Sequence, residues 1–96
     1  MAVTISTHVL DTERGRPAAG VRVELWRDNE LVGAGETDGD GRIPELATGG
    51  AGIYRLVFQP PSPFFRRVEL ELDLQEGDYH VPLLVSPYQC TTYRGS

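Results

Sequence analysis

The chain has 96 residues, of which 40% are hydrophobic and 24% are charged, a composition typical of globular proteins and unlike that of disordered chains. A chain of this length supports one hydrophobic core, so we expect a single domain over residues 1–96. The formal net charge of −5 disfavours binding to a phosphate backbone, so nucleic acid is not an expected partner.

The sequence also gives no support for a membrane or an exported protein. No apolar run approaches the roughly 18 to 20 residues that span a bilayer, and the N-terminus alternates instead of forming a signal peptide. The single cysteine, Cys90, cannot form an intrachain disulfide, and we interpret it as structural. These features predict a cytoplasmic protein with no membrane partner.

Most of the chain alternates between apolar and polar residues with a period of two, the pattern of half-buried β-strands. Clusters of Gly, Pro, Asp and Asn separate the alternating segments and predict turns between them. In chain order, strands are expected over residues 3–9, 21–26, 30–34, 53–59, 67–74 and 79–86, with a short one after Pro87.

Two segments between these strands are predicted as turns. Residues 12–20 are rich in Gly and Pro, and residues 37–42 combine two glycines with the short acids Asp38 and Asp40. The two acids also resemble a fragment of a calcium loop, but the remaining ligands are missing, so a turn is favoured. After this turn, Ile43 and Pro44 are expected to lead into a small loop.

Short strands at this spacing, without a helix-length stretch of 3.6-residue periodicity, predict an all-β fold. We expect seven to eight strands in a two-sheet β-sandwich with little helix. Pro82 lies inside the last long strand and predicts a sheet edge or a break in strand pairing, because proline cannot donate to a ladder.

The two histidines, His8 and His80, each fall on the face of their strand opposite the main apolar residues. This placement suits either functional groups or ordinary structural histidines. Neither has metal-ligand spacing and no cysteine pair accompanies them, so a zinc site is possible but the residues give it no support. Together with Arg42 they can supply an acid/base pair and an anion stabiliser, but their spacing alone does not define a reaction.

Four separated blocks of the sequence resemble the 5-hydroxyisourate hydrolase family, whose members have a transthyretin-like fold. The blocks are Ser6-Thr7-His8-Val9-Leu10-Asp11 with Gly15, Pro17 and Ala18; Thr37-Asp38 to Gly41-Arg42; Tyr79-His80-Val81-Pro82-Leu83-Leu84 with Ser86-Pro87; and the terminal Tyr93-Arg94-Gly95-Ser96. The resemblance covers nearly the whole chain. The chain departs from it at Pro60-Pro61-Ser62-Pro63, where relatives carry a longer, partly helical connection.

The resemblance implies a homotetramer, a dimer of dimers, with active sites in a channel between the dimers and no cofactor or metal. It implies catalytic roles for His8, Arg42 and His80, and substrate binding by His8, Arg42, Tyr93, Arg94, Gly95 and Ser96. The expected reaction is hydrolysis of the cyclic amide of 5-hydroxyisourate in urate degradation. One histidine, preferably His80, would activate water while the other orients substrate or water.

Two other functions are weighed against this hydrolase. The first is a transthyretin-like carrier without catalysis, which would hold a small aromatic ligand in the same channel. The second is a structural sandwich domain of the kind that accompanies larger proteins. The combination of His8, Arg42 and His80 with the terminal tetrapeptide favours the hydrolase over both.

Overall fold

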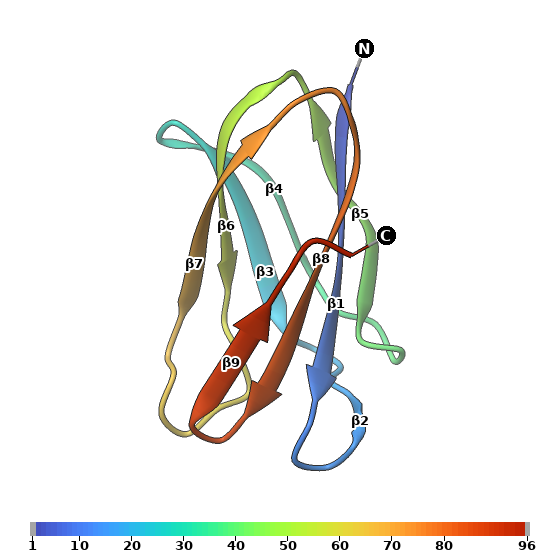
Figure 1. Ribbon diagram of the computed structural model, residues 1–96, viewed down its shortest axis with the longest axis vertical. Helices are drawn as coiled ribbons and strands as arrows, with labels where there is room; N and C mark the ends of the chain where they lie inside the picture. Colours follow the sequence, from blue (N-terminus) through green and yellow to red (C-terminus); the bar gives the residue numbers. More distant parts are fainter. Residues whose placement is uncertain (1, 96) are drawn as a thin grey trace.

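The chain folds into two β-sheets packed face to face, as the ribbon of this computed structural model shows (Figure 1). The structure describes residues 2–95, apart from the side chain of Thr48. The strands within these residues are β1 (Val3–Asp11), β2 (Arg16–Pro17), β3 (Arg22–Arg27), β4 (Glu30–Glu36), β5 (Arg42–Gly49), β6 (Gly52–Phe58), β7 (Val68–Leu74), β8 (Gly77–Ser86) and β9 (Gln89–Thr92). The prediction of an all-β two-sheet fold is confirmed.

Strand β1 is central to the first sheet, and its partners bring distant parts of the chain together. It pairs in parallel with β8 along its whole length, from Val3 opposite Gly77 to Asp11 opposite Val85. On its other side it pairs antiparallel with β5 and, at its end, with β2. Strand β9 extends the sheet beyond β8, and the second sheet is antiparallel in the order β4-β3-β6-β7.

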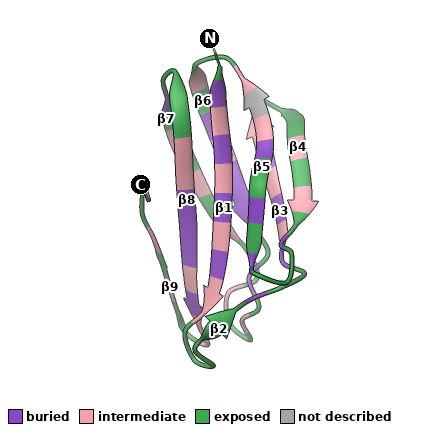
Figure 2. Cartoon of the chain, turned by 90° about the vertical axis from the view of Figure 1, so that its right-hand side faces the viewer, coloured by how far each residue is buried: buried purple, intermediate pink, exposed green. Residues whose placement is uncertain are grey.

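The hydrophobic core fills the space between the two sheets. Buried and partly buried residues alternate along β1, as the colours of Figure 2 show, so one face of the strand packs inward and the other faces out. The most deeply buried large side chains are Phe58, Ile5, Leu25, Leu56 and Leu83. His8 and His80 lie on the outer face of the first sheet, as the alternation predicts.

Two strands are absent from the sequence prediction, and they raise the number of strands within residues 2–95 to nine, above the predicted seven to eight. The two-residue β2 lies inside the predicted turn region. The segment after Ile43 is strand β5, so the expectation of a loop there is wrong. Its pairing with β1 jumps from Ile5 opposite Ala47 to Thr7 opposite Ile43, and this bulge interrupts the period of two.

Pro82 marks the end of the β8–β9 ladder, a break in pairing of the expected kind, whereas the pairing of β8 with β1 continues through Pro82. The β8–β9 ladder begins at Leu83, which lies opposite Thr92. On the other side of Pro82, the C-terminal segment pairs with β8 only through an isolated bridge between His80 and Gly95. Residues 59–67, which include the proline-rich connection, join β6 to β7 without helix. No helix within residues 2–95 has the length and apolarity needed to cross a membrane.

Candidate active site

The parallel pairing of β1 with β8 places the two histidines side by side. His80 lies opposite Ser6, and His8 lies opposite Pro82 two residues further along the ladder. Their imidazole centroids are 6.4 Å apart, with the ring planes inclined at 39°. Both side chains are half-buried on the outer face of the sheet, so water and a small ligand can reach them.

The turn before β5 holds Arg42 next to this pair. The Asp38 carboxylate Oδ1 accepts hydrogen bonds from the backbone amides of Asp40 and Arg42, at 2.9 and 3.0 Å. Gly41 has a φ of +75°, and a Cβ there would lie 2.5 Å from the carbonyl oxygen of Val9, so a residue without a side chain is required. The turn predicted from the two acids is confirmed.

This turn also fixes His8. The Nε2 of His8 donates a hydrogen bond to the backbone carbonyl of Asp40 at 2.9 Å, so Nε2 carries a proton. Arg42 is the register partner of His8 across the β1–β5 ladder. The short loop therefore positions His8 through a backbone carbonyl and Arg42 through a backbone amide.

Burial and nearby positive charges set the electrostatic environment of His80. Burial lowers the pKa of His80 below the ordinary value of 6.5, and the nearby positive charges of His8 and Arg42 lower this pKa further. Its Nδ1 is 2.9 Å from the hydroxyl oxygen of Ser6. His80 is thus kept neutral at a pH where an ordinary histidine begins to take up a proton, as a general base requires.

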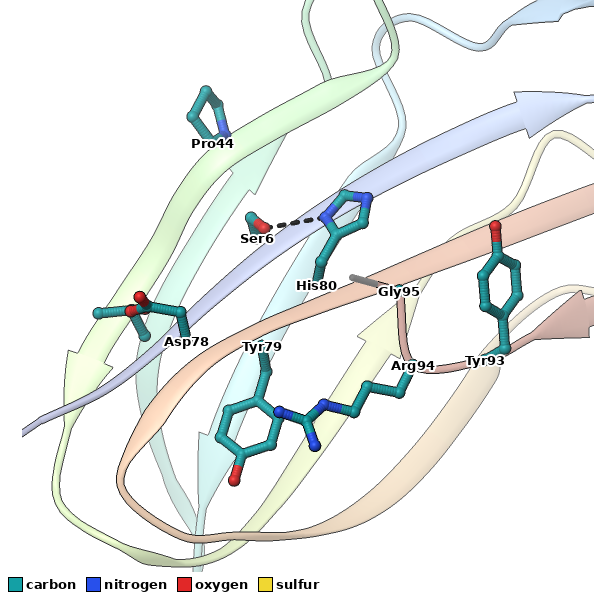
Figure 3. A pocket seen from close by; sticks show the side chains of 9 residues that line it. Ser6, Pro44, Asp78, Tyr79, His80, Tyr93, Arg94 and Gly95 are labelled. Atoms are coloured by element: carbon teal, nitrogen blue, oxygen red, sulfur yellow. Dashed lines mark hydrogen bonds between the residues drawn. The ribbon is translucent and has the colours of Figure 1, made fainter.

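An open groove of about 740 Å³ runs along the sheet in front of His80, and Figure 3 shows the side chains that line it. The groove is lined by Thr4, Ser6, Pro44, Asp78, Tyr79, His80, Tyr93, Arg94 and Gly95. The C-terminal segment forms one wall, because the amide of Gly95 donates a hydrogen bond to the carbonyl of His80 at 2.7 Å. This hydrogen bond places the backbone of Gly95 against the imidazole of His80.

The residues predicted from the sequence take different places around this groove. His80, Tyr93, Arg94 and Gly95 line it, whereas His8 and Arg42 lie beside it. The guanidinium of Arg94 lies over the ring of Tyr79, 4.4 Å from its centroid (Figure 3). Tyr93 is 52% exposed, so it is free to contact a ligand. Ser96 lies outside the described residues, and its role stays a prediction.

Sequence reasoning missed several groups that belong to the groove. Ser6 contacts His80, and the Thr4 hydroxyl donates a hydrogen bond to the Asp78 carboxylate at the far end of the groove. The available signal was their position, since Thr4 and Ser6 share the polar face of the first strand with His8. Within residues 2–95, no three His, Cys, Asp or Glu side chains are grouped so as to hold a metal ion.

Comparison with known proteins agrees with this architecture. A model of the HIUase/Transthyretin family matches residues 5–95. The chain belongs to this family. A 5-hydroxyisourate hydrolase of Halalkalibacterium halodurans is 40% identical to this chain, and the alignment covers all of both proteins. The resemblance inferred from four short blocks is therefore confirmed.

Solved structures of this family have the same fold. The 5-hydroxyisourate hydrolase of Klebsiella pneumoniae superposes with a TM-score of 0.89 at 35% identity, covering 98% of this chain and 99% of that protein. Sea bream transthyretin, solved in complex with thyroxine, gives a TM-score of 0.83 at 30% identity. This match covers 95% of this chain and 93% of that protein. The predicted transthyretin-like sandwich is confirmed.

Proposed function

We propose that this protein hydrolyses the cyclic amide of 5-hydroxyisourate, giving 2-oxo-4-hydroxy-4-carboxy-5-ureidoimidazoline during urate degradation. The observation that carries the proposal is the placement of His8 and His80, 6.4 Å apart, with Arg42 as register partner of His8. Its support also includes relatives named 5-hydroxyisourate hydrolase that match this chain over nearly the whole of both proteins. An acid/base pair beside a cation is what hydrolysis of an amide needs.

The proposed reaction begins with water activated by His80. His80 takes a proton from water, the hydroxide attacks the carbonyl carbon of the ring, and the oxyanion that develops is stabilised by Arg42. The ring C–N bond then breaks with its electron pair on nitrogen, and the imidazolium of His80 returns its proton to that nitrogen, helped by the orientation that His8 provides. His80 suits the first step because its lowered pKa keeps it neutral.

His8 and Arg42 contribute orientation in this proposal. The Nε2 proton of His8 is committed to the carbonyl of Asp40, so His8 is suited to hold substrate or water through its other nitrogen. The planar guanidinium of Arg42 matches the electron-rich oxygens of the substrate ring. Tyr93, Arg94 and Gly95 line one side of the groove and complete the substrate site, and the family resemblance adds Ser96 to this substrate-binding set.

The proposal includes a homotetramer, a dimer of dimers, in which a second copy covers the groove. Its support is the openness of the groove on the outer sheet face, together with the family resemblance. Light scattering of the purified protein tests this assembly, and the expected mass is about four times the 10.6 kDa of one chain. A cytoplasmic location belongs to the same proposal, supported by a lone Cys90 that is free.

The experiment that tests the function follows freshly generated 5-hydroxyisourate by its ultraviolet absorbance. With purified protein the decay is expected to be far faster than spontaneous hydrolysis, and the product to be the ring-opened carboxylate. Decay at the spontaneous rate, with tight binding of a small aromatic ligand, would instead support the carrier function suggested by the likeness to sea bream transthyretin.

A further inference from the structure

The hydroxyl of Ser6 contacts His80 at the ring nitrogen that lies next to the backbone. Ser6 and His80 are register partners on adjacent parallel strands, and both side chains lie on the outer face of the sheet. The Ser6 Oγ is 2.9 Å from Nδ1 of His80 (Figure 3). Both residues belong to the two central strands of this sheet, so the geometry of the contact is set by rigid elements.

The opposite edge of the imidazole is held by the C-terminal segment. A Cβ built on Gly95 would lie 2.7 Å from Cδ2 of His80, so the backbone of Gly95 lies directly against the ring. A ring turned by 180° would place carbon against the Ser6 hydroxyl and Nδ1 against this backbone. The Ser6 contact therefore selects one of the two ring orientations.

The strand on the other side of Ser6 leaves space beside this contact. The β1–β5 register jumps at this point, so three residues of β5, Pro44 to Leu46, lie opposite a single residue of β1, Ser6. Such bulges redirect side chains and are common next to functional sites. Pro44 lines the groove at this point, so the bulge adds to the open space in front of His80.

We infer that Ser6 is a positioning residue, whose Oγ accepts a hydrogen bond from Nδ1–H of His80 and so leaves Nε2 as the basic nitrogen. The inference rests on the proposed hydrolase function, because it concerns the base of that reaction. When Nε2 takes a proton from water, the imidazolium keeps its Nδ1–H, and Ser6 continues to accept from it. The contact thus stabilises both the competent tautomer and the charged form that follows.

The test compares Ser6→Ala with Ser6→Thr, which keeps a hydroxyl on the same strand face. Ser86→Ala is the matched control, since the Ser86 hydroxyl is on the same strand as His80 but donates to the backbone of Gln89. Nitrogen-15 spectra of the imidazole report which nitrogen of His80 carries the proton. The wild type and Ser6→Thr are expected to show the Nδ1–H tautomer, and Ser6→Ala a mixture of both.

In the kinetic experiment, kcat of Ser6→Ala is expected to fall by about tenfold, because the variant loses one neutral hydrogen bond to the base. KM is expected to change by less than about twofold, because Ser6 acts on His80 and not on the bound substrate. Ser6→Thr is expected to restore most of the rate. A wild-type His80 protonated at Nε2, or an active Ser6→Ala with unchanged kcat, would overturn the inference. A wild-type protein that does not accelerate hydrolysis at all would instead overturn the proposed function.

Discussion

Gly95 lies in van der Waals contact with the imidazole of His80 and also pairs with its backbone. The Gly95 amide donates to the His80 carbonyl at 2.7 Å, and a Cβ on Gly95 would approach Cδ2 of the ring to 2.7 Å. The backbone at Gly95 is therefore seated on the proposed base.

Gly95→Ala is expected to displace the His80 ring and to lower kcat/KM by about 10- to 100-fold, because small misplacement of a reacting group is costly. Thermal stability should change little, since Gly95 pairs with the sheet only through an isolated bridge to His80. Gly35→Ala is the matched control, because its Cβ would meet only Ile43 at an ordinary 3.7 Å. Equal activity in the two variants would show that the contact does not position His80.

Arg42→Gln is expected to move the acid limb of the kcat/KM profile to higher pH. Burial, the charge of His8 and the charge of Arg42 each lower the pKa of His80. Removing the Arg42 charge raises this pKa, so the neutral base is lost at a higher pH as the solution is acidified. The shift is partial, because burial and His8 remain.

The control for this change is Arg66→Gln, which removes the same charge from an exposed position outside the groove. Its acid limb should coincide with that of the wild type. Titration of the His80 ring protons by NMR gives an independent value of the pKa. If Arg42→Gln leaves both the ring titration and the acid limb in place, Arg42 does not act on His80 through its charge.

Asp38→Ala is expected to lower kcat/KM several-fold. The Asp38 carboxylate accepts hydrogen bonds from the backbone amides of Asp40 and Arg42 and so shapes the turn that contains these two residues. Asp38→Asn keeps one carbonyl oxygen for these amides and should retain most of the activity. Asp73→Ala removes an exposed carboxylate from β7 and serves as the control. Full activity of Asp38→Ala would contradict a positioning role for the turn.

Phe58→Ala is expected to lower the free energy of unfolding by about 3–5 kcal/mol, the usual result of truncating a buried aromatic side chain. Phe58 is 0% exposed at the centre of the core, whereas Phe64 is 67% exposed. Phe64→Ala should therefore change the stability by less than about 0.5 kcal/mol. Urea unfolding at a single protein concentration measures both, and equal losses would contradict the assignment of the core.

The fold class was predictable because most strands alternate cleanly. Strand β5 was not, since its inward residues Ile43 and Leu46 are three apart instead of two. The bulge opposite Ser6 accounts for this spacing, and Pro44 adds a residue that usually marks a loop. The bulge depends on how β5 pairs with β1, so the sequence of the β5 segment alone carries no pattern that predicts it.

The site was only partly predictable from the residues themselves. The polar-face positions of His8 and His80 followed from the alternation, but their proximity depends on a parallel pairing between the first and the eighth strand. The roles of Ser6 and Gly95 depend on contacts across that ladder and on the path of the C-terminal segment. Such contacts between distant segments follow only from the folded structure.

The most direct test of the account is the rate at which His80→Ala opens 5-hydroxyisourate. The substrate is generated in the presence of wild-type or His80→Ala protein, and its decay is followed by ultraviolet absorbance, with folding checked by circular dichroism. The expected result is a folded His80→Ala protein in whose presence the substrate decays at close to the spontaneous rate. A folded His80→Ala protein that hydrolyses the substrate as fast as the wild type would contradict it.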